Sequence, residues 1–196
     1  MNKSFILLFA LVIVSNWVKA QTSAGSMMVG GAIEFSSVSR EGGSLNDGSS
    51  FTFSPSFGYF ITDNLAVGTS LTLGSERTGT GDAKTVTTSF GVGPFVRYYK
   101  FTSNESLAIF GQAGISIGSG KTDPAFGGVS RNNFLAFSVF PGAAYFFNEH
   151  WAAELSITGF LISTTDPNTS NNDDKTTRVE FGLSSLSPSL GFRYHF

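Results

Sequence analysis

The last eleven residues of the chain alternate between apolar side chains and small or charged ones. One face of this stretch carries Leu186, Pro188, Leu190, Phe192, Tyr194 and Phe196. The other face carries Ser187, Ser189, Gly191, Arg193 and His195. A period of two residues indicates a β-strand with one apolar face. Because the sequence stops within this strand, the apolar face needs a cover, and we expect lipid to provide it.

Seven earlier stretches show the same alternation, so we predict eight strands. The earlier stretches are residues 27–35, 51–61, 65–73, 86–98, 107–118, 134–147 and 151–161. In the seventh, Leu161 falls on the apolar face with Trp151 and Leu155. The eighth extends upstream to Arg178, where its apolar positions are odd-numbered rather than even-numbered. This change of parity predicts a β-bulge near Ser184–Ser185.

Two kinds of connection join the expected strands, and they alternate along the chain. The tight polar turns are residues 62–64, 103–106 and 148–150, and the longer polar connections are residues 40–50, 76–83, 121–132 and 166–175. Short periplasmic turns that alternate with long outer loops are typical of membrane barrels. Backbone groups in hydrocarbon must all be paired, so a sheet that spans a membrane has to close on itself. We therefore predict an all-β fold, an eight-stranded antiparallel up-and-down transmembrane β-barrel with short periplasmic turns and longer extracellular loops.

Aromatic residues gather near the expected periplasmic ends of the strands. They are Tyr59, Tyr98, Tyr145, Trp151 and Tyr194. Tyrosine and tryptophan prefer the membrane–water interface, so we expect these five residues to form an aromatic belt.

The first 20 residues have the three parts of a signal peptide. Lys3 supplies a positive start, residues 5–14 form an apolar run, and Val18-Lys19-Ala20 fits a cleavage site. The alternative is an anchor helix, but the apolar run is shorter than the roughly 20 residues that cross a bilayer. We predict a signal peptide at residues 1–20 and one barrel domain at residues 21–196. The chain contains no cysteine, which excludes disulfides and a lipid-modified cysteine.

Charged residues are rare within the expected strands. The exceptions, all on the small inward face, are Glu34, Arg97, Glu154 and Arg193. A basic residue facing lipid at mid-depth would cost about 2–4 kcal/mol, which supports the inward placement. We expect these four residues to form a charge network in the lumen, with Gln112 as a further member. Glu34 and Arg193 should be neighbours, because the first and last strands close the barrel.

This network has two interpretations. Paired charges can fill a narrow core and satisfy one another, or they can form a gate whose pairs exchange. An eight-stranded barrel has an interior just wide enough for side chains, which favours the filled core. Large rings expected on the inward face beside glycines point the same way, and these are Phe60, Phe95, Phe110 and Phe140.

Two stretches carry a family resemblance. Residues 55–68 read Pro-Ser-Phe-Gly-Tyr-Phe-Ile-Thr-Asp-Asn-Leu-Ala-Val-Gly, and residues 191–196 read Gly-Phe-Arg-Tyr-His-Phe. Here the chain resembles the small eight-stranded outer-membrane β-barrel family of Gram-negative bacteria, in particular the Bacteroidota-type outer-membrane β-barrel domain. The resemblance covers residues 21–196 and implies a place in the bacterial cell outer membrane, in contact with outer-membrane lipid. It also implies that the barrel-assembly machinery binds the terminal strand, with Phe192, Tyr194 and Phe196 as the assembly signal.

Neither catalysis nor cofactor binding is indicated. His150 and His195 lack the spacing to serine and carboxylate side chains that a nucleophilic site needs. Asp166, Asp173 and Asp174 fit solvated loop charge better than a cation site. The net charge of −2 and the lack of a basic block exclude nucleic acid as a partner. We therefore expect no enzymatic activity and no cofactor.

The leading hypothesis is an integral outer-membrane β-barrel protein with a structural or surface-interaction role through its extracellular loops and a side-chain-filled lumen. The sequence does not identify the extracellular ligand or surface partner. One alternative is a narrow, porin-like gated channel for small solutes. A second is a soluble, lipocalin-like ligand-binding barrel. Such a barrel keeps its apolar face inside, whereas the inward face here carries glycine, serine, threonine and charged residues.

Overall fold

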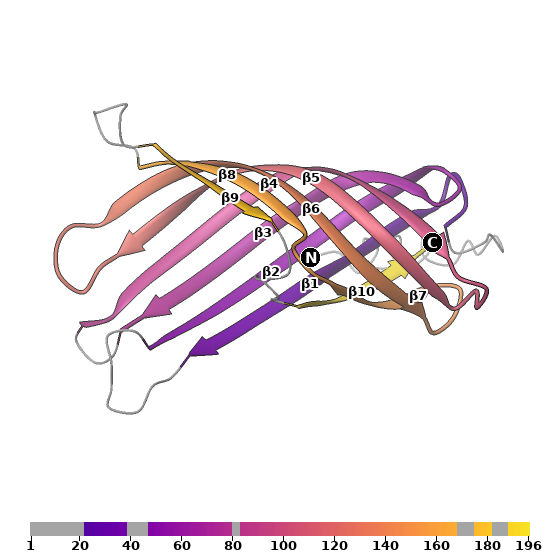
Figure 1. Cartoon of the computed structure of the whole chain (residues 1–196), viewed down its shortest axis with the longest axis horizontal. Helices are drawn as coiled ribbons and strands as arrows, with labels where there is room; N and C mark the ends of the chain where they lie inside the picture. The colour runs from indigo at the N-terminus through magenta and orange to yellow at the C-terminus, as the bar shows by residue number, and fades with distance from the viewer. Residues whose placement is uncertain (1–21, 39–46, 80–82, 168–174, 182–187) are drawn as a thin grey trace, which may run out of the picture.

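The structure is a computed structural model that describes residues 22–38, 47–79, 83–167, 175–181 and 188–196. These residues contain ten antiparallel strands (Figure 1). The strands are β1 (Met27–Val38), β2 (Gly48–Thr62), β3 (Leu65–Thr78), β4 (Thr85–Phe101), β5 (Leu107–Asp123), β6 (Ser130–Phe146), β7 (Trp151–Ser156), β8 (Phe160–Asp166), β9 (Thr176–Phe181) and β10 (Ser189–His195). The predicted signal peptide at residues 1–20 and the predicted bulge at Ser184–Ser185 lie outside the described residues. No helix in the described part of the chain is long and apolar enough to span a bilayer.

The ten strands form one closed, eight-stranded barrel. Strands β1 to β6 pair in chain order around the wall. Residues 142–146 of β6 pair with β7, and residues 133–139 of β6 pair with β8, so β7 and β8 act as one interrupted strand. In the same way, β10 pairs with β7 and β9 pairs with β8. Pairing of β1 with β10 closes the barrel and confirms the predicted fold class.

The interruption between β7 and β8 is a bulge that the sequence analysis did not predict. Ser156 pairs with Gly142, and Phe160 pairs with Val139, so four steps along one strand match three along its neighbour. The extra residue reverses the faces of everything after it. Leu161 therefore pairs with an inward residue of β6, and its predicted place on the outer face was wrong. A glycine within the strand, at position 159, was the available signal.

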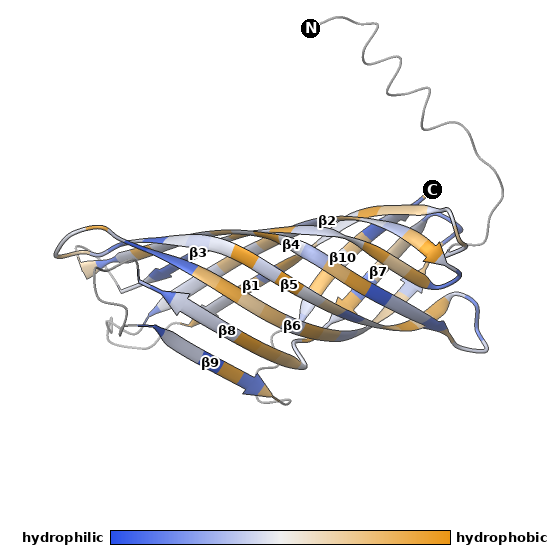
Figure 2. Ribbon diagram, turned by 90° about the horizontal axis from the view of Figure 1, so that it is seen from above, coloured by the Kyte–Doolittle hydropathy of each residue, from blue (hydrophilic) through white to orange (hydrophobic). Residues whose placement is uncertain are grey.

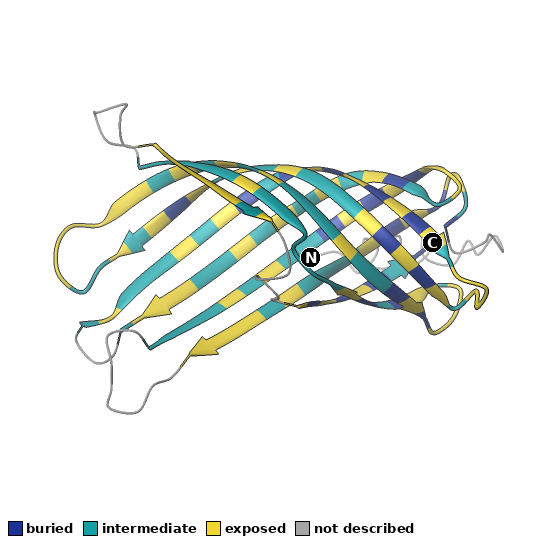
Figure 3. Cartoon of the chain, in the orientation of Figure 1, coloured by how far each residue is buried: buried dark blue, intermediate teal, exposed yellow. Residues whose placement is uncertain are grey.

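The outer face of the barrel is apolar, and the inner face is small, polar or aromatic. Large apolar side chains are exposed on the outer face of most strands, with Val29, Phe53, Ile117, Leu135 and Leu190 as examples. The apolar positions cover much of the barrel wall in Figure 2, and exposed and covered residues alternate along β2 and β4 in Figure 3. A soluble monomer rarely exposes so extensive an apolar surface. The surface suits a barrel embedded in lipid.

Tyrosine and tryptophan lie on the outer face beside the tight turns. Tyr59, Tyr98, Tyr145 and Trp151 are all exposed there. Tyr194 is partly covered, and its ring centroid lies 5.0 Å from that of Trp151. This arrangement has the position and composition of an interfacial aromatic belt.

Asparagine shapes the tight turns. Asn64 has a φ of 68°, a left-handed conformation that asparagine tolerates better than most residues. Asn148 Oδ1 accepts hydrogen bonds from the backbone N–H groups of His150 and Trp151, at 2.9 and 2.8 Å. Such bonds let asparagine hold the backbone of a turn. In Figure 1 these turns lie at the same end as the C-terminus, and the longer connections lie at the opposite end. In barrels of this kind the short turns face the periplasm.

Candidate functional site

Three buried charged residues meet inside the barrel. Arg97 on β4, Glu154 on β7 and Arg193 on β10 are each about 5% exposed or less. Arg97 Nη1 donates to Glu154 Oε1 at 2.6 Å, and Arg193 Nε donates to Glu154 Oε2 at 2.7 Å. One carboxylate therefore holds one arginine on each of its oxygens. We call Arg97, Glu154 and Arg193 the lumen triad.

Polar neighbours complete the hydrogen bonding of the triad. Tyr99 Oη donates to Glu154 Oε1 at 3.0 Å. Arg97 Nε donates to Gln112 Oε1 at 2.8 Å, and Arg193 Nη1 donates to Ser56 Oγ at 2.9 Å. The Arg97 guanidinium also lies 4.2 Å from the centroid of the Phe110 ring. Buried charges cost a large desolvation free energy unless they are paired and hydrogen-bonded, and these contacts meet that requirement.

Strand register explains how residues far apart in sequence reach one another. Arg193 lies opposite Ala152 of β7 and opposite Gly30 of β1. Glu154 is two residues from Ala152 on the same face, so it is the diagonal neighbour of Arg193. Gly30 leaves room for the arginine, because a Cβ at position 30 would lie 2.8 Å from Arg193 Cγ and closer still to the β10 backbone.

Glu34 does not join the triad. The pairing of β1 with β10 places Gly30 opposite Arg193, and Glu34 lies four residues further along β1. At 3.4 Å per residue this is about 14 Å along the strand. Glu34 lies instead at the level of Ser189, because the preceding residue of β1, Ile33, pairs with Leu190. The expectation that Glu34 neighbours Arg193 is therefore corrected, because alternation fixes the face of a residue but not its level along the barrel.

An aromatic layer lies on the periplasmic side of the triad. It consists of Phe60, Tyr99, Phe146 and His195, with Met28 beside them, and all five are almost fully buried. The ring centroid of His195 lies 5.8 Å from that of Phe60, 6.2 Å from that of Tyr99 and 5.3 Å from that of Phe146. Tyr99 was not among the predicted lumen residues, although its parity matches that of Arg97 on the same strand. The layer and the triad together place eight buried side chains in the periplasmic half of the lumen.

The residues of the expected assembly signal lie on the barrel's closing strand. Phe192 and Phe196 point outward and are exposed, and Tyr194 stacks on Phe196 with ring centroids 5.9 Å apart. The Phe196 N–H donates to the Met27 carbonyl at 2.9 Å, and the Met27 N–H donates to the Phe196 carbonyl at 2.6 Å. The terminal residue is thus hydrogen-bonded to the first strand.

The described residues hold no group of three histidine, cysteine, aspartate or glutamate side chains that could bind a metal ion. Asp166 Oδ2 lies 3.3 Å from Lys175 Nζ. Asp173 and Asp174 lie outside the described residues. His150 stacks on Tyr194, with ring centroids 5.5 Å apart, at the periplasmic rim.

Comparison with known proteins places this geometry among membrane barrels. Residues 4–185 match the family model described as outer membrane protein beta-barrel domain. The structure is similar to that of Neisserial surface protein A, with 15% identity, a TM-score of 0.52 and coverage of 87% of this chain and 96% of that one. It is also similar to the N-terminal β-barrel domain of OprF from Pseudomonas aeruginosa, with 16% identity, a TM-score of 0.49 and coverage of 88% and 98%. No curated protein matches the sequence. The first likeness supports the fold alone.

Proposed function

Because the chain belongs to the family of outer-membrane protein β-barrel domains and lies in the bacterial outer membrane, we propose that it has a structural or surface-contact role with a closed lumen. In this proposal the extracellular loops carry whatever binding the protein performs, and the barrel itself catalyses no reaction. The observation that carries the proposal is the lumen triad above the aromatic layer.

The lumen contacts cross the barrel from wall to wall. Arg97 comes from β4, Glu154 from β7 and Arg193 from β10. Their polar partners Ser56 and Gln112 come from β2 and β5. Side chains from five of the strands therefore meet at one level. A barrel of eight strands leaves little space beyond such a cluster, which supports a filled interior over a continuous water path.

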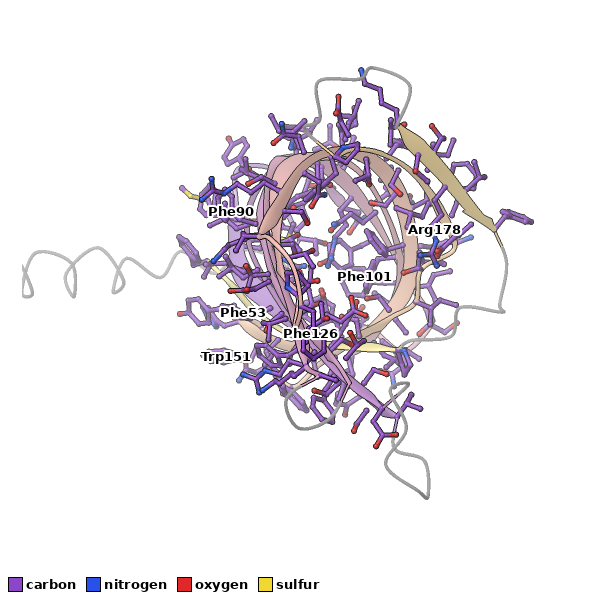
Figure 4. The ribbon with its side chains drawn as sticks, turned by 90° about the vertical axis from the view of Figure 1, so that its left-hand side faces the viewer. Phe53, Phe90, Phe101, Phe126, Trp151 and Arg178 are labelled. Atoms are coloured by element: carbon purple, nitrogen blue, oxygen red, sulfur yellow. The ribbon has the colours of Figure 1, made fainter. Side chains whose placement is uncertain are left out.

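The outer connections supply exposed apolar side chains that suit surface contact. Phe126 lies in the connection between β5 and β6 and is 80% exposed (Figure 4). Val129 in the same connection is also exposed. Aromatic anchors dominate the energy of many protein interfaces, so Phe126 is the residue of this loop that we expect to matter most for binding.

A conductance measurement tests the closed lumen. The purified barrel is inserted into planar bilayers, and single-channel recordings compare the wild type with Arg97→Ala. Arg77→Ala serves as the matched control, because Arg77 is an exposed arginine near the outer end of β3. We expect no discrete openings from the wild type or the control. Discrete wild-type openings that change in Arg97→Ala but not in Arg77→Ala would refute the closed lumen.

That refuting result would favour the second candidate function, a narrow gated channel for small solutes. The supporting observation is that Glu154 has two arginine partners, one on each oxygen. The carboxylate could release one arginine and keep the other, so a local rearrangement would not leave it unpaired. The soluble, lipocalin-like alternative does not fit, because the family is one of the outer membrane and the apolar face of this barrel is outside.

Three further features of the proposal concern export and origin. Residues 1–20 act as a signal peptide, and Phe192, Tyr194 and Phe196 are read by the barrel-assembly machinery. The segment at residues 55–68 supports a place in the Bacteroidota branch of the family. Cell fractionation with N-terminal sequencing of the mature protein tests the first feature, with Gln21 as the expected first residue.

A further inference from the structure

The outer face of β4, β5 and β6 carries an ordered sequence of side chains near the extracellular end. Strand pairing places these residues in rows that run across the three strands. The innermost row is Val92, Ile117 and Leu135; the next is Phe90, Ser119 and Asn133; the outermost is Thr88, Lys121 and Arg131. Along the outside of the barrel, the surface thus changes from apolar to hydrogen-bonding to cationic.

A groove of about 430 Å³ lies over the two outer rows. Six of its lining residues are the members of those rows, and the other three are Ser89, Gly120 and Asn132, which stand between them on the strands. Phe90 lies on the outside of the wall at this place (Figure 4). Small-ligand sites occupy roughly 300–1,000 Å³, so the groove has the size for one polar headgroup but not for whole acyl chains as well.

The cationic row contains an unfavourable pair. Lys121 lies directly opposite Arg131 in the β5–β6 register. Like charges at opposite positions destabilise a sheet pair. Within the described residues, the salt bridge at this place joins Lys121 Nζ to Asp123 Oδ2 at 3.8 Å, and both side chains are about half exposed. Asp166 lies opposite Asn133, and its carboxylate is 3.3 Å from Lys175 Nζ. Three cations, Lys121, Arg131 and Lys175, thus stand against the carboxylates of Asp123 and Asp166, which leaves a local positive charge that an anion would balance.

We propose that this groove binds the phosphate-bearing headgroup of an outer-leaflet glycolipid. The phosphate lies between Lys121 and Arg131, where it removes the repulsion between them through charge-assisted hydrogen bonds. The sugar contacts the hydroxyl of Ser119, over the Phe90 ring. The acyl chains leave the groove toward the membrane and lie on Ile117 and Leu135, which are exposed on the outer face.

The order of the rows favours a lipid over a soluble anion. A free phosphate needs only the two cations, whereas the hydrogen-bonding row and the apolar row extend the site in the direction of the hydrocarbon. About 14 Å separate the apolar row from the cationic row along the strands, at 3.4 Å per residue. The order of the rows is the order of acyl chain, sugar and phosphate in a glycolipid.

The test measures which lipids stay bound to the barrel. The full mature protein is reconstituted in phosphatidylcholine vesicles that contain either bisphosphorylated lipid A or its dephosphorylated form. Native mass spectrometry then counts the retained glycolipid. The double variant Lys121→Gln/Arg131→Gln is compared with the control Arg77→Gln/Lys84→Gln. The control removes one exposed arginine and one exposed lysine that do not line the groove, near the outer ends of β3 and β4. A heat-dependent shift in gel mobility shows that every variant is folded.

We expect the wild type to retain phosphorylated lipid A in preference to the dephosphorylated form. This preference should fall about thirtyfold in the Lys121/Arg131 variant, because each surface cation contributes a factor of roughly five. The control pair keeps the preference. An equal loss in both pairs would show general attraction to the surface and overturn the proposal, as would wild-type retention that ignores the phosphate. Complete displacement of the lipid by inorganic phosphate would also overturn it, because the groove would then be a site for the free ion.

Discussion

Removal of the carboxylate from the lumen triad should destabilise the barrel more than removal of Arg193. Glu154 neutralises part of the charge of Arg97 and Arg193, and all three are about 95% buried. Glu154→Gln leaves two buried guanidinium groups without a counter-charge. Breaking a buried ion pair in this way costs about 3–5 kcal/mol. We expect the free energy of unfolding to fall by that amount.

Arg193→Met is the informative comparison. It leaves Arg97 and Glu154 as a neutral pair and keeps most of the side-chain volume. Its cost should be roughly 1.5–3 kcal/mol, the range for a lost hydrogen bond to a charged group. The order of the two variants therefore reports the charge balance of the site, rather than a general sensitivity of the core to substitution.

The assay is urea unfolding of the barrel in lipid vesicles, followed by the fluorescence of Trp151 and by the heat-dependent shift in gel mobility. Glu149→Gln is the control, because Glu149 is exposed in the turn before β7 and should change stability by no more than about 0.5 kcal/mol. If Glu154→Gln costs less than Arg193→Met, or no more than Glu149→Gln, the triad is hydrated and screened. The lumen would then contain water rather than being filled by side chains.

Two further predictions follow from packing and from strand closure. Gly118→Ala should lower the free energy of unfolding by about 1–3 kcal/mol in the same urea assay, because a Cβ at position 118 would meet the Phe90 carbonyl and the Phe134 ring. Gly111→Ala on the same strand is the control: a Cβ at position 111 would have no atom within 4 Å, so the substitution should be nearly neutral. Deletion of Phe196 should reduce the fraction of protein in the membrane that shows the heat-dependent gel shift of a folded barrel, since it removes both backbone hydrogen bonds to Met27. The control is Phe147→Ala, which changes another exposed aromatic residue at the periplasmic rim and should assemble normally.

Alternation in the sequence predicted the strands and their faces well, because the period of two is a local property. It placed Arg97, Glu154 and Arg193 on the inward side and Leu155 on the outward side, as the structure has them. It failed where the structure depends on register. The bulge between Ser156 and Phe160 turned Leu161 inward, and the β1–β10 register placed Glu34 beside Ser189. Gly159 marked where a bulge could form, but neither the size of the shift nor the level of Glu34 can be read from one strand alone, since register depends on the partner strand.

The lumen triad and the terminal strand form one structural unit rather than two separate features. In the described part of the chain, β10 (Ser189–His195) lies between β7 and β1 and closes the barrel. Arg193 on this strand bonds Glu154 of β7 on one side and Ser56 of β2 on the other, so its side chain reaches across β1 at the closure. Phe196 adds backbone bonds to Met27 of β1 at the rim. The inward face of the last strand therefore holds the seam together, while its outward face presents Phe192 and Phe196 to the surroundings. An Arg193 substitution should consequently weaken closure as well as the charge balance of the lumen, whereas substitution of Phe192 should leave the lumen contacts unchanged.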